Sequence, residues 1–349
     1  MNPSIRAGIW SASWSGFLAA MLTLAVVARV AQAENGAAPS LEGYLKRVGY
    51  LPVVLKKSEH GKLLAEGVLA GKKRLFLVDT GCGRTTLDEG AARGLKSLGE
   101  LGVTLDDSFW GKISDPAIVL MDKLALGGAQ FLNQPAKVMK LRMDYTFVAF
   151  DGILGCDFFF RNYCLIDCLH GRLYVRGARP SDDATSALET TLRQSGFTDV
   201  PINVKYGLTV AAKLNGEMSR LVVDTGATFS LLDNALAKHL GLTAVKQDEP
   251  RLGSLMRKDW SANIVGFGKI GAHNMWVTTV KSWELGSLQW TNVHVGVVDL
   301  KSWDLAEPGT RSENVRGILG REMLTARGAL IDYHGRKLWF RPSEASPGH

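Results

Sequence analysis

The chain has 349 residues, of which 46% are hydrophobic and 21% charged, and its formal net charge is +7 at pH 7. This length is enough for two domains of ordinary size. The lysines and arginines are scattered rather than clustered, which argues against a nucleic-acid-binding surface.

The first 33 residues have the pattern of a secretory signal. Arg6 precedes an apolar stretch from Phe17 to Val27, and Ala31-Gln32-Ala33 has the small-x-small pattern of a cleavage site. That stretch is short for a membrane span, which needs about 20 residues. We therefore expect a signal peptide (1–33) that is cleaved after Ala33, and a periplasmic or secreted protein. An uncleaved anchor is the alternative.

The elements that follow are predicted to be mostly strands. Residues 34–48 form either a leader or an outer strand. Short β-prone runs bounded by Gly, Asp or Pro then recur through residues 49–176 and again through 199–342. Residues 177–198, rich in Arg, Ser, Asp, Ala and Thr, are interpreted as a linker. Helices are expected to be few and short: Asp88 and Asp233 have the position of helix N-caps, and one helical turn should follow each Gly-Ile-Leu-Gly.

The chain contains an internal duplication. Asp-Thr-Gly occurs at residues 79–81 and 224–226, each time after an apolar run and nine residues before another Asp. Further matching blocks follow in the same order in both halves, among them LGGAQFLN and LGSLQWTN at residues 126 and 285, and GILG at residues 152 and 317. Ordered blocks of this kind indicate two copies of one unit.

The two aspartates are candidates for a catalytic pair. Two carboxyl groups a few ångströms apart do not both ionise easily, so one keeps a proton and the other is charged. The charged group can then take a proton from water while the neutral one donates to a carbonyl. A pseudo-twofold axis would bring Asp79 and Asp224 together. Thr80 and Thr225 would hydrogen-bond across that axis, and the absence of side chains at Gly81 and Gly226 would let backbone amides approach the carboxylates.

The paired motifs resemble those of aspartic peptidases, specifically the retropepsin-like branch with two lobes in one chain. The resemblance covers most of residues 50–341. It implies an all-β fold of two similar β-barrel lobes, 49–176 and 199–342, with a catalytic cleft between them. It also implies that Asp79 and Asp224 are the catalytic dyad, and that each later hydrophobic-hydrophobic-Gly block supports its Asp-Thr-Gly loop.

A flap over the cleft is also expected. The glycine-rich, apolar run around Gly266, Phe267 and Gly268 is similar to a retropepsin flap, and a shorter counterpart surrounds Trp110. An ordinary β-hairpin is the alternative. No tyrosine lies in either run, which favours the retropepsin-like assignment over the pepsin-like one.

The first loop departs from the family pattern at Cys82-Gly83. Cys82 is interpreted as a packing residue or a disulfide partner rather than a redox control. The fold implied by the resemblance makes Cys82–Cys156 one candidate pair, and Cys156–Cys164 is another; Cys168 completes the set of four cysteines. Neither loop has a hydroxyl residue directly after its glycine, because Cys82 and Ala227 stand there. We therefore expect activity shifted toward neutral pH.

The resulting hypothesis is a secreted or periplasmic aspartic endopeptidase that acts on extended peptides or proteins. It needs no metal or organic cofactor, binds no nucleic acid and is a monomer. A catalytically silent peptide-binding or scaffold protein with the same fold is the alternative. A third hypothesis is an enzyme that cleaves one dedicated partner.

Overall fold

The computed structural model describes residues 41–58, 61–100, 104–107, 111–114, 116–141, 149–204, 208–245, 276–300 and 315–342. The chain forms two compact units, residues 1–48 and 49–349. The described part of the first unit is helix α2 (Leu41–Arg47), in which Lys46 Nζ lies 2.8 Å from Glu42 Oε1. Residues 34–48 were predicted to form either a leader or an outer strand. The outer strand is wrong for residues 41–47, because they form α2, in which an ion pair one turn apart favours a helix.

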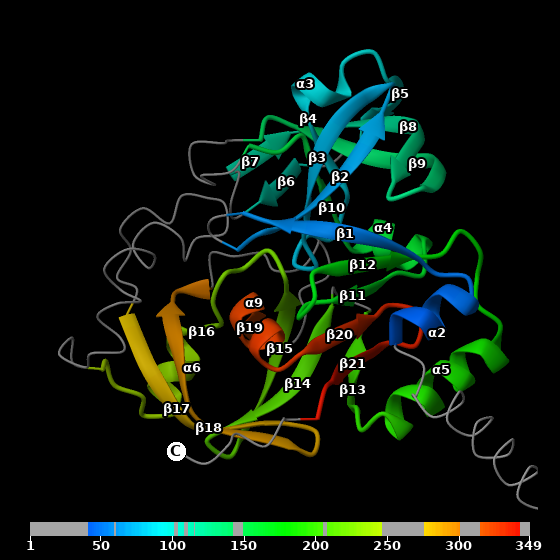
Figure 1. Ribbon diagram of the computed structural model, residues 1–349. Coiled ribbons are helices and arrows are strands. Elements are labelled where there is room, and N and C mark those ends of the chain that lie inside the picture. Colours follow the sequence, from blue (N-terminus) through cyan, green and yellow to red (C-terminus); the bar gives the residue numbers. More distant parts are fainter. Residues whose placement is uncertain are drawn as a thin grey trace, which may run out of the picture. The chain divides into compact units, whose positions relative to one another are not determined.

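The first half of the second unit consists of short strands and hairpins with two short helices (Figure 1). In chain order they are β1 (Leu51–Lys57), β2 (Leu63–Leu69), β3 (Lys72–Val78), β4 (Thr86–Asp88), α3 (Glu89–Ala92), β5 (Lys96–Glu100), β6 (Thr104–Asp107), β7 (Gly111–Ser114), β8 (Ala117–Leu126), β9 (Ala129–Met139), β10 (Gly152–Leu154), α4 (Cys156–Arg161), β11 (Leu165–Asp167) and β12 (Arg172–Val175).

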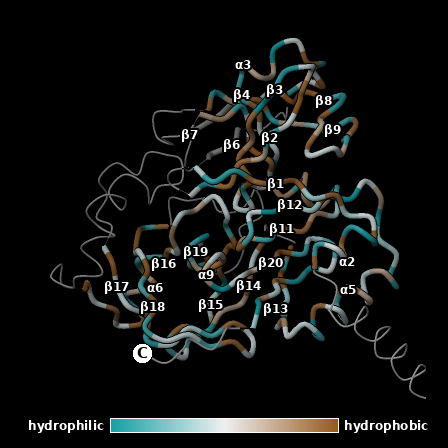
Figure 2. Tube along the Cα trace, viewed as in Figure 1, coloured by the Kyte–Doolittle hydropathy of each residue, from teal (hydrophilic) through white to brown (hydrophobic). Residues whose placement is uncertain are grey.

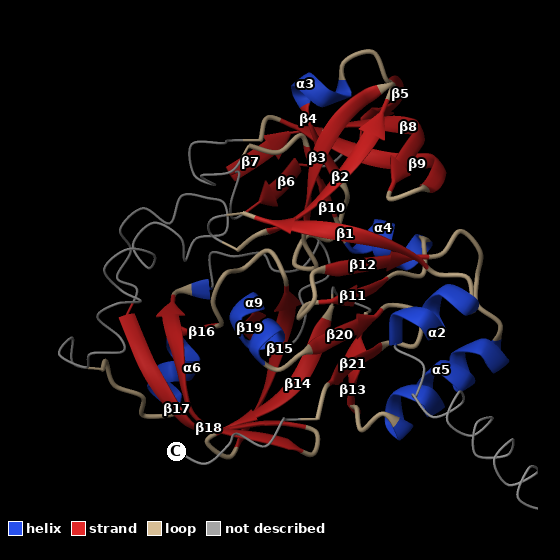
Figure 3. Ribbon diagram, in the orientation of Figure 1, coloured by secondary structure: helices blue, strands red, loops and turns tan. Residues whose placement is uncertain are grey.

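The second half repeats this order, and strands again dominate it (Figure 3). Its elements are β13 (Thr198–Asn203), β14 (Thr209–Leu214), β15 (Glu217–Asp224), β16 (Leu231–Asp233), α6 (Asn234–His239), β17 (Trp276–Leu285), β18 (Leu288–Val298), β19 (Val315–Gly320), α9 (Arg321–Ala326), β20 (Ala329–Asp332) and β21 (Lys337–Phe340). The mostly β fold with few helices is as predicted.

Both halves pair their strands in the same way. The hairpin β2–β3 corresponds to β14–β15, and β8–β9 corresponds to β17–β18. Strand β10 runs parallel to β3 and antiparallel to β4, as β19 does to β15 and β16. The predicted caps are also present: Asp88 accepts from Gly90 N at 2.8 Å and Asp233 from Ala235 N at 3.1 Å. This common pairing supports the duplication inferred from the sequence.

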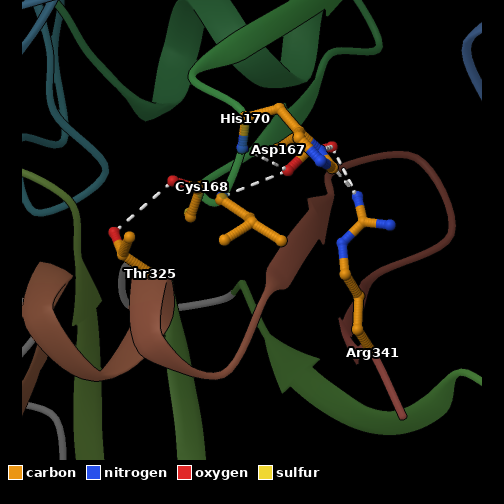
Figure 4. Close-up of polar contacts among 6 residues, drawn as sticks. Asp167, Cys168, His170, Thr325 and Arg341 are labelled. Atoms are coloured by element: carbon orange, nitrogen blue, oxygen red, sulfur yellow. Dashed lines mark hydrogen bonds and ion pairs between the residues drawn. The ribbon is translucent and has the colours of Figure 1, made fainter. Parts of the chain in front are cut away.

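A six-stranded antiparallel sheet joins the halves, in the order β1-β12-β11-β20-β21-β13. At its centre Ile166 of β11 lies opposite Ile331 of β20. Asp167, at the end of β11, accepts from Arg341 Nη2 at 2.6 Å and lies 2.9 Å from His170 Nδ1 (Figure 4). These contacts tie the first half to the segment after β21.

The segment predicted as a linker contains a helix, α5 (Asp182–Gln194). Ser181 caps it by accepting from Ala184 N at 3.2 Å, and the buried Leu188 and Leu192 form its apolar face. The composition of this segment did not predict a helix, because Ser and Thr favour turns. Here Thr190 and Thr191 each donate to a carbonyl four residues earlier, both at 2.8 Å, which satisfies their hydroxyls within the helix.

The main hydrophobic core extends through both halves of the second unit. Figure 2 shows that hydrophobic residues are concentrated on the strands. Phe76, Leu154, Leu221 and Leu319 are buried in the strands that lead to or flank the two Asp-Thr-Gly loops. The loops therefore begin on rigid, buried elements. No helix in the described part of the chain is long and apolar enough to cross a membrane.

Candidate active site

Each Asp-Thr-Gly loop leaves the end of a buried strand. β3 ends at Val78, and Asp224 is the last residue of β15. The GILG blocks form the parallel neighbours of these strands: Leu154 lies beside Val78, and Leu319 beside Val223. In the first half, Asp79 N also donates to Leu154 O at 3.1 Å. The second block therefore lies alongside its loop in both halves, as the resemblance implied.

The two threonines connect the loops by four hydrogen bonds. Thr80 N donates to Thr225 Oγ1 at 3.1 Å, and Thr225 N donates to Thr80 Oγ1 at 3.0 Å. Each hydroxyl also donates to the strand of the other half, Thr80 to Val223 O at 2.7 Å and Thr225 to Val78 O at 2.8 Å. Both side chains are almost completely buried. This reciprocal set fixes the two loops relative to each other.

The two carboxyl groups lie together between the loops. Asp79 Oδ1 accepts from Gly81 N at 2.9 Å and from Cys82 N at 3.2 Å. Asp224 Oδ1 accepts from Gly226 N at 2.7 Å and from Ala227 N at 3.0 Å. A Cβ on Gly81 would overlap the Asp224 carboxyl group, and one on Gly226 would overlap that of Asp79. Only glycine permits this close approach.

Burial raises the pKa of Asp79 well above its ordinary value. The charge of Asp224 and the hydrogen bond between the two carboxyl groups raise this pKa further, because a second negative charge opposes ionisation. The nearby Lys62 and the amide of Gly81 act in the opposite direction without reversing it. Burial and the neighbouring carboxyl group therefore both favour the protonated form of Asp79.

A helical turn supports each loop from below. Cys156 N donates to Cys82 O at 2.8 Å, and its counterpart Arg321 N donates to Ala227 O at 3.0 Å. The acidic residue that follows accepts a hydrogen bond from the residue just before the next strand of the same half. Asp157 Oδ1 accepts from Thr85 N at 2.7 Å, and Glu322 Oε1 accepts from Ser230 N at 2.6 Å. The first residue of the supporting helical turn is thus neutral in one half, Cys156, and cationic in the other, Arg321.

Two residues beside the site were not singled out from the sequence. Lys62 Nζ donates to Gly226 O, and the side chain is buried. Tyr333 OH lies 3.6 Å from Cys156 Sγ beneath the first loop. Neither belongs to a motif, and each reaches the site from a distant part of the chain.

All four cysteines lie within the described residues and are free thiols. The two candidate disulfides are therefore not formed. Cys156 Sγ donates to Thr80 O at 3.1 Å, and Cys82 Sγ donates to Arg84 O at 3.0 Å. Burial raises the pKa of the Cys156 thiol to about 12, so it remains protonated and packs as a neutral donor.

The predicted flap residues Gly266, Phe267, Gly268 and Trp110 lie outside the described residues. Their role stays a prediction. In the part of the chain that the structure describes, no group of three or more His, Cys, Asp or Glu side chains is arranged to hold a metal ion. The chemistry of the described site is that of two carboxyl groups and the donors around them.

Two comparisons with known proteins gave matches. The sequence profile of the aspartyl protease family matches residues 210–323. Among solved structures, the aspartic proteinase from Irpex lacteus superposes with a TM-score of 0.51 at 13% sequence identity, covering 86% of this chain and 99% of that one. A search of curated protein sequences gave no significant match.

The superposition extends over both halves, so the chain shares the two-lobed β fold of that proteinase. The family match in the second half and this shared fold together support an aspartic peptidase family of the pepsin and retropepsin type.

Proposed function

We propose that this protein is an aspartic endopeptidase whose catalytic dyad is Asp79 and Asp224. One observation carries the proposal: the two carboxyl groups lie together, and each is held by two amides of its own loop. The raised pKa of Asp79 supports a pair with one proton and one charge, which is the state that acid-base hydrolysis requires. The family match supports the same reaction class.

The reaction follows from this protonation state. A water molecule between the carboxyl groups gives a proton to the charged Asp224 as its oxygen attacks the scissile carbonyl carbon. Asp79 donates its proton to the carbonyl oxygen, and a tetrahedral intermediate forms. Asp224 then gives the proton it took from water to the amide nitrogen, while Asp79 takes a proton back from a hydroxyl of the intermediate. The C–N bond breaks, which releases a carboxylic acid and an amine. The threonine bonds between the loops hold the two carboxyl groups in fixed positions relative to each other.

The test is peptide cleavage by the mature protein at several pH values, with a diverse peptide mixture as substrate. We expect Asp79→Asn and Asp224→Asn each to lower the rate by at least about 10³-fold, since either change removes an acid-base partner. Asp122→Asn is the matched control, because that carboxylate is exposed on β8. Cleavage that survives both dyad substitutions would rule out the dyad.

The remaining expectations belong to the same proposal. The N-terminal signal pattern supports export to the periplasm or the medium, where an extended peptide or protein would be the substrate. A catalytically silent binding protein is the alternative outcome: a folded wild-type protein would then bind peptides and cleave none at any pH. Light scattering of the purified protein tests the expected monomer.

A further inference from the structure

Lys62 reaches the second Asp-Thr-Gly loop from the other half of the molecule. It lies in the turn between β1 and β2, where Lys62 N donates to Ser58 Oγ at 3.0 Å and Ser58 N donates to Lys62 O at 3.0 Å. This turn directs the side chain inward, so that only 5% of it is exposed. Its Nζ donates to Gly226 O, two residues after Asp224.

A buried ammonium group is unfavourable unless negative charge lies nearby. Asp224 and Asp79 both favour the charged form of Lys62, whereas Arg321 opposes it. Burial nevertheless dominates and lowers the pKa of Lys62 to about 8. The ammonium is therefore still protonated at neutral and acidic pH, so the dyad works beside a permanent positive charge throughout that range.

The positive charge is placed asymmetrically. Lys62 donates to the loop of Asp224, and the Arg321 guanidinium packs against Gly61, the neighbour of Lys62 in the turn. The first loop instead rests on Cys156 and Tyr333, which burial keeps neutral. Coulomb attraction therefore favours negative charge on the carboxyl group of the second loop.

We propose that Lys62 is a positioning residue of the dyad: its ammonium group anchors the Asp224 loop through Gly226 O and holds the pair's negative charge on Asp224, leaving the proton on Asp79. This inference rests on the proposed peptidase function. It assigns different roles to two aspartates whose local hydrogen bonds are nearly identical.

A pH profile separates this role from a merely structural one. Lys62 from the β1–β2 turn faces the pair, and Arg321 from α9 lies beside that turn at Gly61. The neutral Cys156 and Tyr333 lie on the other side. Lys62 lowers the pKa of Asp79. Its removal therefore moves the pH limits of the pair upward, by about one pH unit for one neighbouring charge.

The first experiment measures kcat/KM against pH for wild type, Lys62→Met, Lys62→Gln and Lys62→Arg. Both neutral variants should move the alkaline limb, which reports loss of the Asp79 proton, upward by about one unit, while Lys62→Arg should stay within a few tenths of wild type. Lys56→Met is the matched control, because Lys56 lies on the same hairpin with its side chain 61% exposed. Lower rates at every pH with unmoved limbs would overturn the proposal.

A second experiment needs no catalysis. The carboxyl ¹³C resonance of Asp79, assigned through Asp79→Asn, is titrated in folded wild type and in whichever neutral Lys62 variant folds. We expect the Asp79 titration to move upward without the ammonium; an unmoved titration would overturn the proposal. If wild type cleaves no peptide but this shift is present, the peptidase function fails while the electrostatic role of Lys62 stands.

Discussion

The two Asp-Thr-Gly loops have the same geometry but different surroundings. In each, one carboxylate oxygen accepts two amides of its own loop, and a threonine reaches the partner strand. The supports differ: the first loop lies over a neutral thiol, Cys156, and the second over Arg321, with Lys62 bonded to its glycine carbonyl.

This difference shows which parts of a duplicated site can diverge. The backbone amides and threonine hydroxyls set the distance between the carboxyl groups, so they must match in both copies. The charges around them influence which carboxyl group holds the proton. Where two acids have environments that push their pKa values apart, one can act as the general acid and the other as the general base. The variants below test where the two halves are equivalent and where they are not.

The largest effect is expected where the halves are equivalent, at the loop glycines. In Gly81→Ala and Gly226→Ala the added methyl group would overlap the carboxyl group of the opposite aspartate. That carboxyl group is held by two amides and cannot move aside without breaking them. Because a displacement of about 1 Å costs about 10²-fold in rate, we expect each variant to lose at least that much in kcat/KM.

The control for the glycine variants is Gly177→Ala, since a Cβ at Gly177 meets nothing within 4 Å. It should retain wild-type activity. A large loss in only one of the two loop variants would contradict the equivalence of the loops.

Much of this site was predictable from the sequence, because short-range signals define it. The apolar run before each Asp, the glycine after each Thr and the repeated GILG predicted the strands, the loops and their supports. Lys62 was not predictable, because it acts 164 residues away from Gly226 in sequence. Helix α5 was not predicted, because Ser and Thr residues usually favour turns. In this helix the hydroxyls of Thr190 and Thr191 instead donate to carbonyls of the preceding turn.

The threonine bonds should give the next largest effect, on stability. Thr80→Val keeps the shape of the side chain but leaves Thr225 N without its acceptor and Val223 O without this donor. Each buried group left unsatisfied costs about 1–3 kcal/mol, so we expect a loss of about 4 kcal/mol in the free energy of unfolding. Thr225→Val should cost the same.

Urea denaturation measures both losses, with Thr80→Ser as the control that retains the hydroxyl. A difference of more than about 1 kcal/mol between the two valine variants would show that the cross-bonded loops do not contribute equally.

The central sheet offers a pair of aspartates that should differ. Burial raises the pKa of Asp332 to about 6. An acid whose pKa is higher in the folded protein contributes stability that is fully present below its pKa in the unfolded chain, about 3.9. That stability, about 3 kcal/mol, is lost as the pH rises through about 6. Asp332→Asn should remove this pH dependence. Its counterpart Asp167 is paired with Arg341, so Asp167→Asn should instead destabilise the protein at neutral pH.

Denaturation of wild type and both variants at pH 4, 5, 6 and 7 separates these outcomes. If Asp332→Asn kept the full wild-type slope of stability against pH between 4 and 6, the assignment of that slope to Asp332 would be wrong.

The smallest difference concerns the acids below the loops. Asp157 Oδ1 accepts from Thr85 N and Thr85 Oγ1, both at 2.7 Å, and from Phe158 N at 2.8 Å. Asp157→Asn keeps an acceptor there but loses the charge that strengthens these bonds, which should cost about 1–2 kcal/mol. Burial raises the pKa of Glu322, so its ionised form is disfavoured in the fold.

Glu322→Gln should therefore be nearly neutral at pH 4, where the acid already carries its proton, and more stable than wild type at pH 7, where ionisation of buried Glu322 lowers stability. Urea midpoints of both variants at pH 4 and 7 measure the contrast. Equal losses at pH 7 would mean that the two supports are electrostatically alike. The electrostatic asymmetry of the site would then lie in Lys62, beside the carboxyl groups, and in Arg321, beside the turn that holds Lys62.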